Sequence, residues 1–120
     1  MLKKIHHVQL AMPIGQEQLA ATFYRDALGF VVEPKPPKLA ARGGIWFCCD
    51  GIHLHLGVET PFRPAKKAHP AFECAEIAAL AERLERAAFK VQWDDALPGY
   101  RRFFTHDPFG NRIEILEPTA

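Results

Sequence analysis

The sequence predicts an α+β fold in which two tandem βαβββ modules form a cupped mixed sheet with the helices on its outer face. Two observations predict this fold. First, segments with the two-residue alternation of strands surround two segments whose apolar residues recur every three or four positions, as in helices. Second, the order of strand, helix and three strands occurs twice. The length of 120 residues suits a single domain, with module one at about 1–58 and module two at about 68–118.

Module one is expected to begin with a strand at 5–12, in which Val8, Leu10 and Met12 share one face. A helix follows at 16–28 and ends before Gly29. Asp50-Gly51 separates two alternating segments, which is a hairpin signal. The other expected strands lie at 30–32, 45–49 and 52–56, and three prolines predict a loop at 34–38.

Module two is expected to repeat this order after a basic, proline-interrupted linker at 60–67. Its helix at 75–88 carries an apolar stripe made of Ile77, Leu80, Leu84 and Ala87. Asp107-Pro108-Phe109-Gly110 predicts a tight turn, because Pro presets φ at the second turn position. The expected strands lie at 69–74, 89–93, 101–105 and 112–116, with a loop at 94–99.

Residue spacing indicates that the two modules are a duplication. Phe30 lies 23 positions after His7, and Phe89 lies 20 positions after His69. From each phenylalanine, a glycine follows 21 positions later, at Gly51 and at Gly110. Four positions further on stand His55 and Glu114. A single three-residue insertion in module one explains the difference between the spacings of 23 and 20. Superposing the two halves of the sequence therefore pairs His7 with His69 and His55 with Glu114.

These four paired residues are candidate metal ligands, because each is expected on the strand face opposite an apolar row. If the apolar rows pack on the helices, the imidazole and carboxylate groups converge on the concave face. Imidazole with carboxylate suits zinc, iron, manganese, nickel or cobalt rather than calcium. The alternatives are that Glu114 faces solvent on a half-exposed strand, that His7 is a satisfied histidine, and that His53 takes the place of His55.

Composition excludes several classes of function. A formal net charge of +1 gives no reason to expect nucleic acid or an anionic membrane as a partner, and no segment is apolar enough to span a bilayer. The sequence contains no serine, so a serine nucleophile is excluded. Three cysteines, two of them adjacent, favour reduced thiols over disulfides and therefore a cytoplasmic protein.

The chain resembles the vicinal oxygen chelate superfamily, which includes glyoxalase I, fosfomycin-resistance thiol transferases, extradiol dioxygenases and bleomycin-resistance proteins. Three motifs carry the resemblance: the Ile-x-His-Val-x-Leu opening at 5–10, Ala-His-x-Ala-Phe at 68–72, and Asp-Pro-Phe-Gly-Asn-Arg-Ile-Glu at 107–114. The resemblance implies one divalent ion (Zn, Ni, Fe, Mn or Co), a small-molecule substrate and a homodimer. Its ligand positions match His7, His69 and Glu114, with a fourth position at His55.

Three departures narrow the activity that the resemblance implies. Glyoxalase I-like enzymes carry Glu or Gln where this chain has His55, which argues against lactoylglutathione isomerisation. Fosfomycin-resistance enzymes carry a serine-rich loop where this chain has residues 97–102. The set of His7, His69 and Glu114 matches the iron triad of extradiol dioxygenases, whose catalytic domains are longer.

The resulting hypothesis is a divalent-metal-dependent glyoxalase/dioxygenase-like enzyme that activates a small oxygenated metabolite by Lewis-acid catalysis. Glu114 is expected to act as ligand and base, and His53 to relay protons near neutral pH. Tyr100 and Arg102 share a strand face and are expected to bind the substrate. The alternative is a metal-free protein that sequesters a drug, as bleomycin-resistance proteins do.

Overall fold

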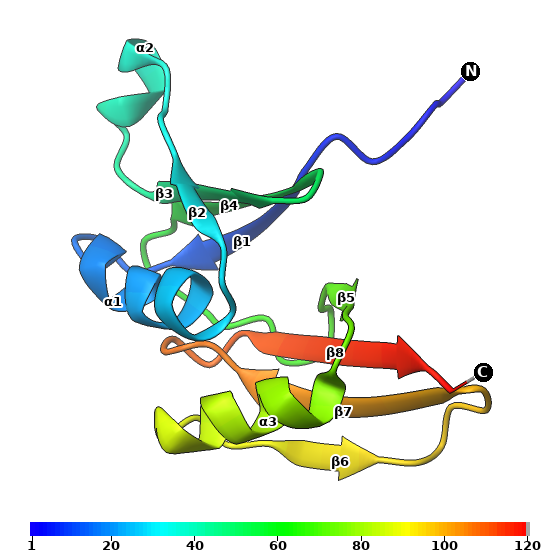
Figure 1. Ribbon diagram of the computed structural model, residues 1–120. Helices are drawn as coiled ribbons and strands as arrows, with labels where there is room; N and C mark the ends of the chain where they lie inside the picture. The colour runs from blue at the N-terminus through cyan, green and yellow to red at the C-terminus, as the bar shows by residue number, and fades with distance from the viewer. Residues whose placement is uncertain (120) are drawn as a thin grey trace. The chain divides into compact units, whose positions relative to one another are not determined.

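The computed structural model describes residues 1–119, which divide into two compact units, one comprising Met1–Pro64 and one beginning at Ala65. Each unit contains one βαβββ module with its own four-stranded mixed sheet, so the predicted fold class is confirmed (Figure 1). Among residues 1–119, no helix is long and apolar enough to cross a membrane.

Module one has the sheet order β1-β4-β3-β2, with β1 parallel to β4 and the other neighbours antiparallel. Its elements are β1 (Val8–Met12), α1 (Glu17–Ala21), η1 (Thr22–Ala27), β2 (Val31–Glu33), α2 (Pro37–Ala40), β3 (Ile45–Cys49) and β4 (Ile52–Val58). The helix expected at 16–28 is confirmed, although its second half, η1, has π-helical hydrogen bonding.

The core of module one lies between the apolar sheet face and the α1/η1 helix. Leu10 and Met12 of β1 are buried on the face that the alternation predicts. Tyr24 of η1 packs on Phe47 of β3 with ring centroids 5.3 Å apart, and both side chains are fully buried. Burial of large aromatic side chains is a major source of stability, and here it leaves the opposite face of the sheet free for polar groups.

The prediction of a loop at 34–38 is wrong in one respect, because its last two residues, Pro37 and Lys38, begin a one-turn helix, α2. Pro37 occupies the first turn of α2, where its missing N–H costs nothing because that group has no partner within a helix. The helix is too short to be predicted by periodicity.

Module two has the sheet order β5-β8-β7-β6, the same connectivity as in module one. Its elements are β5 (Ala71–Glu73), α3 (Ile77–Arg86), β6 (Gln92–Asp94), β7 (Tyr100–His106) and β8 (Arg112–Pro118). The strand expected at 89–93 begins only at Gln92. Ala88 adopts a positive φ of 66°, and the Phe89 N–H donates to the Leu84 carbonyl, so these residues extend the end of the helix.

The core of module two lies between α3 and the apolar face of β7 and β8 (Figure 1). Ile77 and Leu84 are buried as predicted, but Leu80 is only half-buried and Ala87 is exposed. Ala81 is buried instead, so the buried stripe of α3 consists of Ile77, Ala81 and Leu84. Phe103, Ile113 and Ile115 supply the sheet side of this core.

Strand register shows that the modules are structurally equivalent at the candidate ligands. His55 of β4 pairs with Gln9 of β1 and Trp46 of β3. Glu114 of β8 pairs with Ala71 of β5 and Phe104 of β7. In both modules the candidate ligand therefore lies on a central strand, between a parallel neighbour and an aromatic residue of the antiparallel neighbour.

Candidate functional site

The polar face of module one carries one continuous row across all four strands. Gln9, His55, Trp46 and Glu33 occupy paired positions on β1, β4, β3 and β2. Side chains at paired positions project from the same face of a sheet. The row therefore places an imidazole, an indole and a carboxylate on the face opposite the core.

His55 is held in an aromatic stack. Its ring lies parallel to Trp46, with centroids 3.9 Å apart and an interplanar angle of 4°. It also stacks with His7 at 4.2 Å and 19°. Because two rings cannot occupy the same face at such distances, His55 lies between Trp46 and His7. Burial lowers the pKa of His55, and the nearby His7 lowers it further, so the ring is neutral at pH 7 and keeps a lone pair for a ligand.

Two more imidazoles lie beside this stack. Nδ1 of His6 is 3.0 Å from Nδ1 of His7, so one of these nitrogens donates to the other. His6 stacks over His53 with centroids 6.3 Å apart. His53 Nδ1 lies 3.2 Å from Glu33 Oε1, where a protonated Nδ1 donates to the carboxylate. The predicted proton-relay residue thus has a carboxylate partner.

These residues line a pocket of about 690 Å³ that lies wholly within module one. That volume is in the range of small-molecule sites. Gly57 lines the pocket, and the Gln9 side chain lies so close to it that a Cβ there would be 2.6 Å from Gln9 Nε2. Apolar side chains of Leu39 and Val58 complete the surface beyond the imidazoles.

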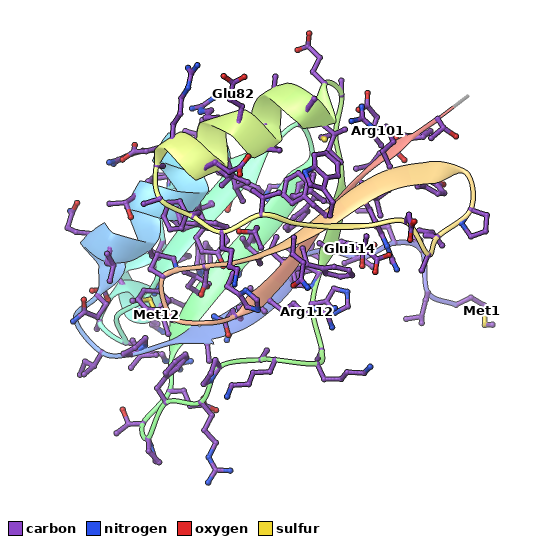
Figure 2. The ribbon with its side chains drawn as sticks, turned by 90° about the horizontal axis from the view of Figure 1, so that it is seen from below. Met1, Met12, Glu82, Arg101, Arg112 and Glu114 are labelled. Carbon is purple, nitrogen blue, oxygen red and sulfur yellow. The ribbon has the colours of Figure 1, made fainter. Side chains whose placement is uncertain are left out.

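In module two, Glu114 is buried mid-strand, with only 6% of its surface exposed (Figure 2). Its Oε1 lies 2.8 Å from His69 Nε2, and the other ring nitrogen, Nδ1, lies 2.8 Å from the Lys67 carbonyl oxygen. Both ring nitrogens of His69 therefore lie beside oxygen atoms. The Nδ1–H bond to a backbone carbonyl fixes the ring orientation, as it does for many metal-binding histidines.

Arg102 joins Glu114 to Asp94. Its Nη1 lies 3.3 Å from Glu114 Oε2, and its Nε donates to Asp94 Oδ1 at 2.9 Å. The Ala96 N–H and the Arg102 guanidinium hold the pKa of Asp94 below its usual value. The contacts with Asp94 and Glu114 use three of the five guanidinium N–H groups of Arg102, so two remain for an anionic substrate. Tyr100 projects from the same face of β7 and is exposed.

The structure brings the predicted site residues together in two groups, one in each module. His7, His53 and His55 form the module one group, and His69, Glu114 and Arg102 form the module two group. Across residues 1–119, no three or more His, Cys, Asp or Glu side chains are close enough to hold a metal ion. The shared four-ligand centre therefore stays a prediction.

Sequence reasoning missed the central position of Trp46 and the contact between Glu33 and His53. The signal for Trp46 was present in the hairpin. A two-residue turn at Asp50-Gly51 pairs Cys49 with Ile52 and therefore pairs Trp46 with His55. No comparable signal predicts the pairing of the short β2 strand, which brings Glu33 alongside Trp46.

The chain belongs to the Glyoxalase/Bleomycin resistance protein/Dioxygenase superfamily, whose sequence model it matches over residues 4–115. It is similar to a glyoxalase family protein from Bacillus anthracis, with 44% identity, a TM-score of 0.96, and coverage of 99% of this chain and 98% of that one. The predicted resemblance is therefore confirmed. No curated protein sequence matches the chain.

More distant structures share the fold. An antibiotic binding protein from Streptomyces sp. CB03234 has 21% identity and a TM-score of 0.76, covering 99% of this chain and 100% of that one. A fosfomycin resistance protein from Listeria monocytogenes has 14% identity and a TM-score of 0.78, covering 100% and 97%. A variant of the Listeria protein is known in complex with Mn(II) and 1S,2S-dihydroxypropylphosphonic acid, with 13% identity, a TM-score of 0.75, and coverage of 96% and 90%.

Proposed function

We propose that this protein is a divalent-metal-dependent enzyme that acts on a small oxygenated molecule. In this proposal His7, His55, His69 and Glu114 hold the ion. The observation that carries the proposal is the buried Glu114, whose position on β8 is equivalent by register to that of His55 on β4. Arg102 and His69 compensate the buried carboxylate of Glu114 in module two, and a duplicated fold offers matching donors from both modules for an ion.

The donor set fits Zn²⁺, Ni²⁺, Fe²⁺, Mn²⁺ or Co²⁺, because it consists of imidazole nitrogens and one carboxylate. Two local features support this fit. The pKa of His55 is lowered, which favours the neutral form that binds metals. His69 has its Nδ1 anchored to the Lys67 carbonyl, which leaves Nε2 as the ligand nitrogen. When bound, such an ion supplies Lewis-acid activation of a substrate oxygen.

The chain's own residues supply orientation and proton transfer. His53, with Glu33 at its Nδ1, is placed at the pocket wall to take up or release a proton. Arg102 holds the Oε2 oxygen of Glu114 and so fixes the orientation of that carboxylate. Release of Glu114 by His69 or Arg102 frees a carboxylate to act as a base. Tyr100 and Arg102 are the proposed substrate contacts in module two.

The test is elemental analysis of untagged protein that has been incubated with Mn²⁺ and desalted. About one ion per chain is expected in the wild type, and much less in Glu114→Ala and in the milder Glu114→Gln. Glu73→Ala and His106→Ala remove exposed residues of the same types and serve as controls. Circular dichroism confirms that each variant is folded. No uptake of Mn²⁺, Zn²⁺, Ni²⁺, Fe²⁺ or Co²⁺ by the wild type contradicts the proposal.

A second candidate function is metal-free binding of a small molecule such as a drug. The observation that favours it is the pocket of module one, which has an aromatic stack and about 690 Å³ of space without any contribution from module two. A wild-type protein that takes up no metal yet binds aromatic compounds supports this second function instead.

The superfamily also informs two proposals about the state of the protein. We propose a homodimer, which light scattering during size-exclusion chromatography would detect as twice the chain mass. We also propose a cytoplasmic location, since the three cysteines are free thiols in the structure. Cell fractionation tests the second proposal.

A further inference from the structure

The module one pocket has a basic end, formed by Lys35 and Arg42. Both residues line the pocket, on the segment that leads from β2 through α2 to β3. The Lys35 ammonium donates to the Gly43 carbonyl and lies over the Trp46 ring, 5.9 Å from its centroid. The Arg42 side chain is exposed, and among residues 1–119 it forms no ion pair.

Neither cation forms an ion pair with a carboxylate of residues 1–119, and the nearby Glu17 carboxylate accepts from the Gly44 N–H at 2.8 Å. Of the described residues that line this pocket, one is acidic, Glu33. Its carboxylate lies 3.2 Å from His53 Nδ1. Two cations beside a partly enclosed surface attract an anion, because local charge raises the concentration of oppositely charged ligands.

The surface next to the cations is flat and apolar. One face of Trp46 is covered by His55 at 3.9 Å, and the Lys35 ammonium lies over the ring, 5.9 Å from its centroid and within the range of a cation–π contact. Leu39 and Val58 also line this part of the pocket. The second indole face becomes available to a planar ligand body when the flexible Lys35 side chain turns from the ring to the ligand's carboxylate, and aromatic rings gain from offset stacking.

The spacing of the two ends sets the size of the ligand. His55 and Gly57 lie two residues apart on β4, which corresponds to about 7 Å along a strand. Gly44 packs against Gly57, so this end of the pocket lies about 7 Å along β4 from His55, roughly the length of a substituted aromatic ring. A ligand of that length reaches both the cations and the proposed metal ligand His55.

We infer that the module one pocket binds a small aromatic or conjugated carboxylate, with its carboxylate at Lys35 and Arg42 and its planar body against Trp46. This inference rests on the proposed function in that it takes the same pocket as the substrate site and names the substrate class. The carboxylate contact itself requires no metal.

The test compares trans-cinnamate with trans-cinnamamide, its uncharged counterpart, by titration calorimetry on chelator-treated wild-type protein. Cinnamate is expected to bind roughly tenfold more tightly, because charge-assisted hydrogen bonds to Arg and Lys exceed neutral ones. Arg42→Gln is expected to remove most of this preference, and Lys35→Gln to reduce it. Lys38→Gln is the matched control, because it removes an exposed cation of α2 that does not line the pocket.

Location is checked in a Trp93→Phe background, which leaves Trp46 as the only tryptophan of the two in the chain. Cinnamate should then change the Trp46 fluorescence with the same affinity that calorimetry gives. Equal affinity for the two compounds, no saturable binding, or equal losses in Arg42→Gln and Lys38→Gln would each overturn the inference.

The same titrations, repeated with Mn²⁺ present, separate this inference from the proposed function. A carboxylate preference without Mn²⁺ uptake supports the inference and contradicts the metal-dependent enzyme. Mn²⁺ uptake without a carboxylate preference does the reverse.

Discussion

The two modules share one topology but carry different chemistry at equivalent positions. The row across module one is Gln9, His55, Trp46 and Glu33, whereas the corresponding row across module two is Ala71, Glu114, Phe104 and Gln92. Module one stacks aromatic rings beside an open pocket. Module two ties Glu114 into a network of ion pairs with His69 and Arg102.

This difference indicates a division of work between the duplicated halves. In module two the charges are satisfied by one another, so the network fixes the orientation of a buried carboxylate. In module one two basic side chains that form no ion pair line the pocket beside the Trp46 ring. We therefore propose that module one recognises the ligand and that module two supplies the anionic metal ligand.

The largest expected contrast concerns the hairpin turns. Asp107 is buried and accepts hydrogen bonds from the Phe109 and Asn111 backbone N–H groups and from Asn111 Nδ2, each at 2.9 Å. Asp107→Ala should lower the free energy of unfolding by about 3 kcal/mol, at roughly 1 kcal/mol per bond. Asp50 occupies the module one turn, exposed and with φ of 46°, so Asp50→Gly should change it by less than about 0.5 kcal/mol. Urea denaturation measures both, and equal losses would contradict the contrast.

Sequence reasoning predicts the repeat well because glycines and alternating apolar residues mark each strand. Gly51 and Gly110 fix the frame that pairs His55 with Glu114, and strand register confirms that frame. The burial of Glu114 could be suspected from its apolar neighbours on β8. Its contacts with His69 and Arg102 could not, because they depend on rotamers and on pairing between strands distant in sequence.

Short elements were the least predictable. The α2 helix spans only four residues, too few for a periodic pattern. The start of β6 depends on the positive φ of Ala88, a backbone state that alanine rarely adopts and that no residue type announces. Lys35 and Arg42 lie on either side of α2, and the path of the chain through this short helix places both at the pocket. Their role could therefore not be assigned from the sequence.

A second contrast compares the equivalent residues Glu114 and His55. Glu114→Gln breaks a charged network around a buried group and should lower the free energy of unfolding by about 2–4 kcal/mol. His55→Gln removes ring stacking with Trp46 and His7 and should cost about 1 kcal/mol. Denaturation of metal-free protein at pH 7 gives both values. A larger loss for His55→Gln would reverse the assignment of the stabilising network to module two.

The smallest expected contrast concerns the thiols at high pH. Burial raises the pKa of Cys74 to about 11, and the carboxylates of Glu117 and Glu73 contribute. The unfolded thiol has a pKa of about 8.5, so it releases its proton first. The resulting stabilisation is present below pH 8.5 and is lost as the pH rises toward 11.

Denaturation of wild type and Cys74→Ala between pH 8 and 10.5 measures this loss, which should be smaller in the variant. Burial also raises the pKa of Cys49 in module one, so Cys49→Ala provides the matched comparison. Parallel pH profiles for wild type and Cys74→Ala would show that the thiol of module two contributes nothing.

The most direct test of the central claim is Mn²⁺ titration calorimetry on four single variants, two in each module. The claim is that both modules contribute ligands to one ion, so His7→Ala, His55→Ala, His69→Ala and Glu114→Ala should each weaken binding. Each loss should exceed the roughly 10–100-fold that removal of an outer-shell partner causes. His106→Ala should bind like the wild type. Loss of Mn²⁺ affinity in the variants of one module alone would contradict a shared centre.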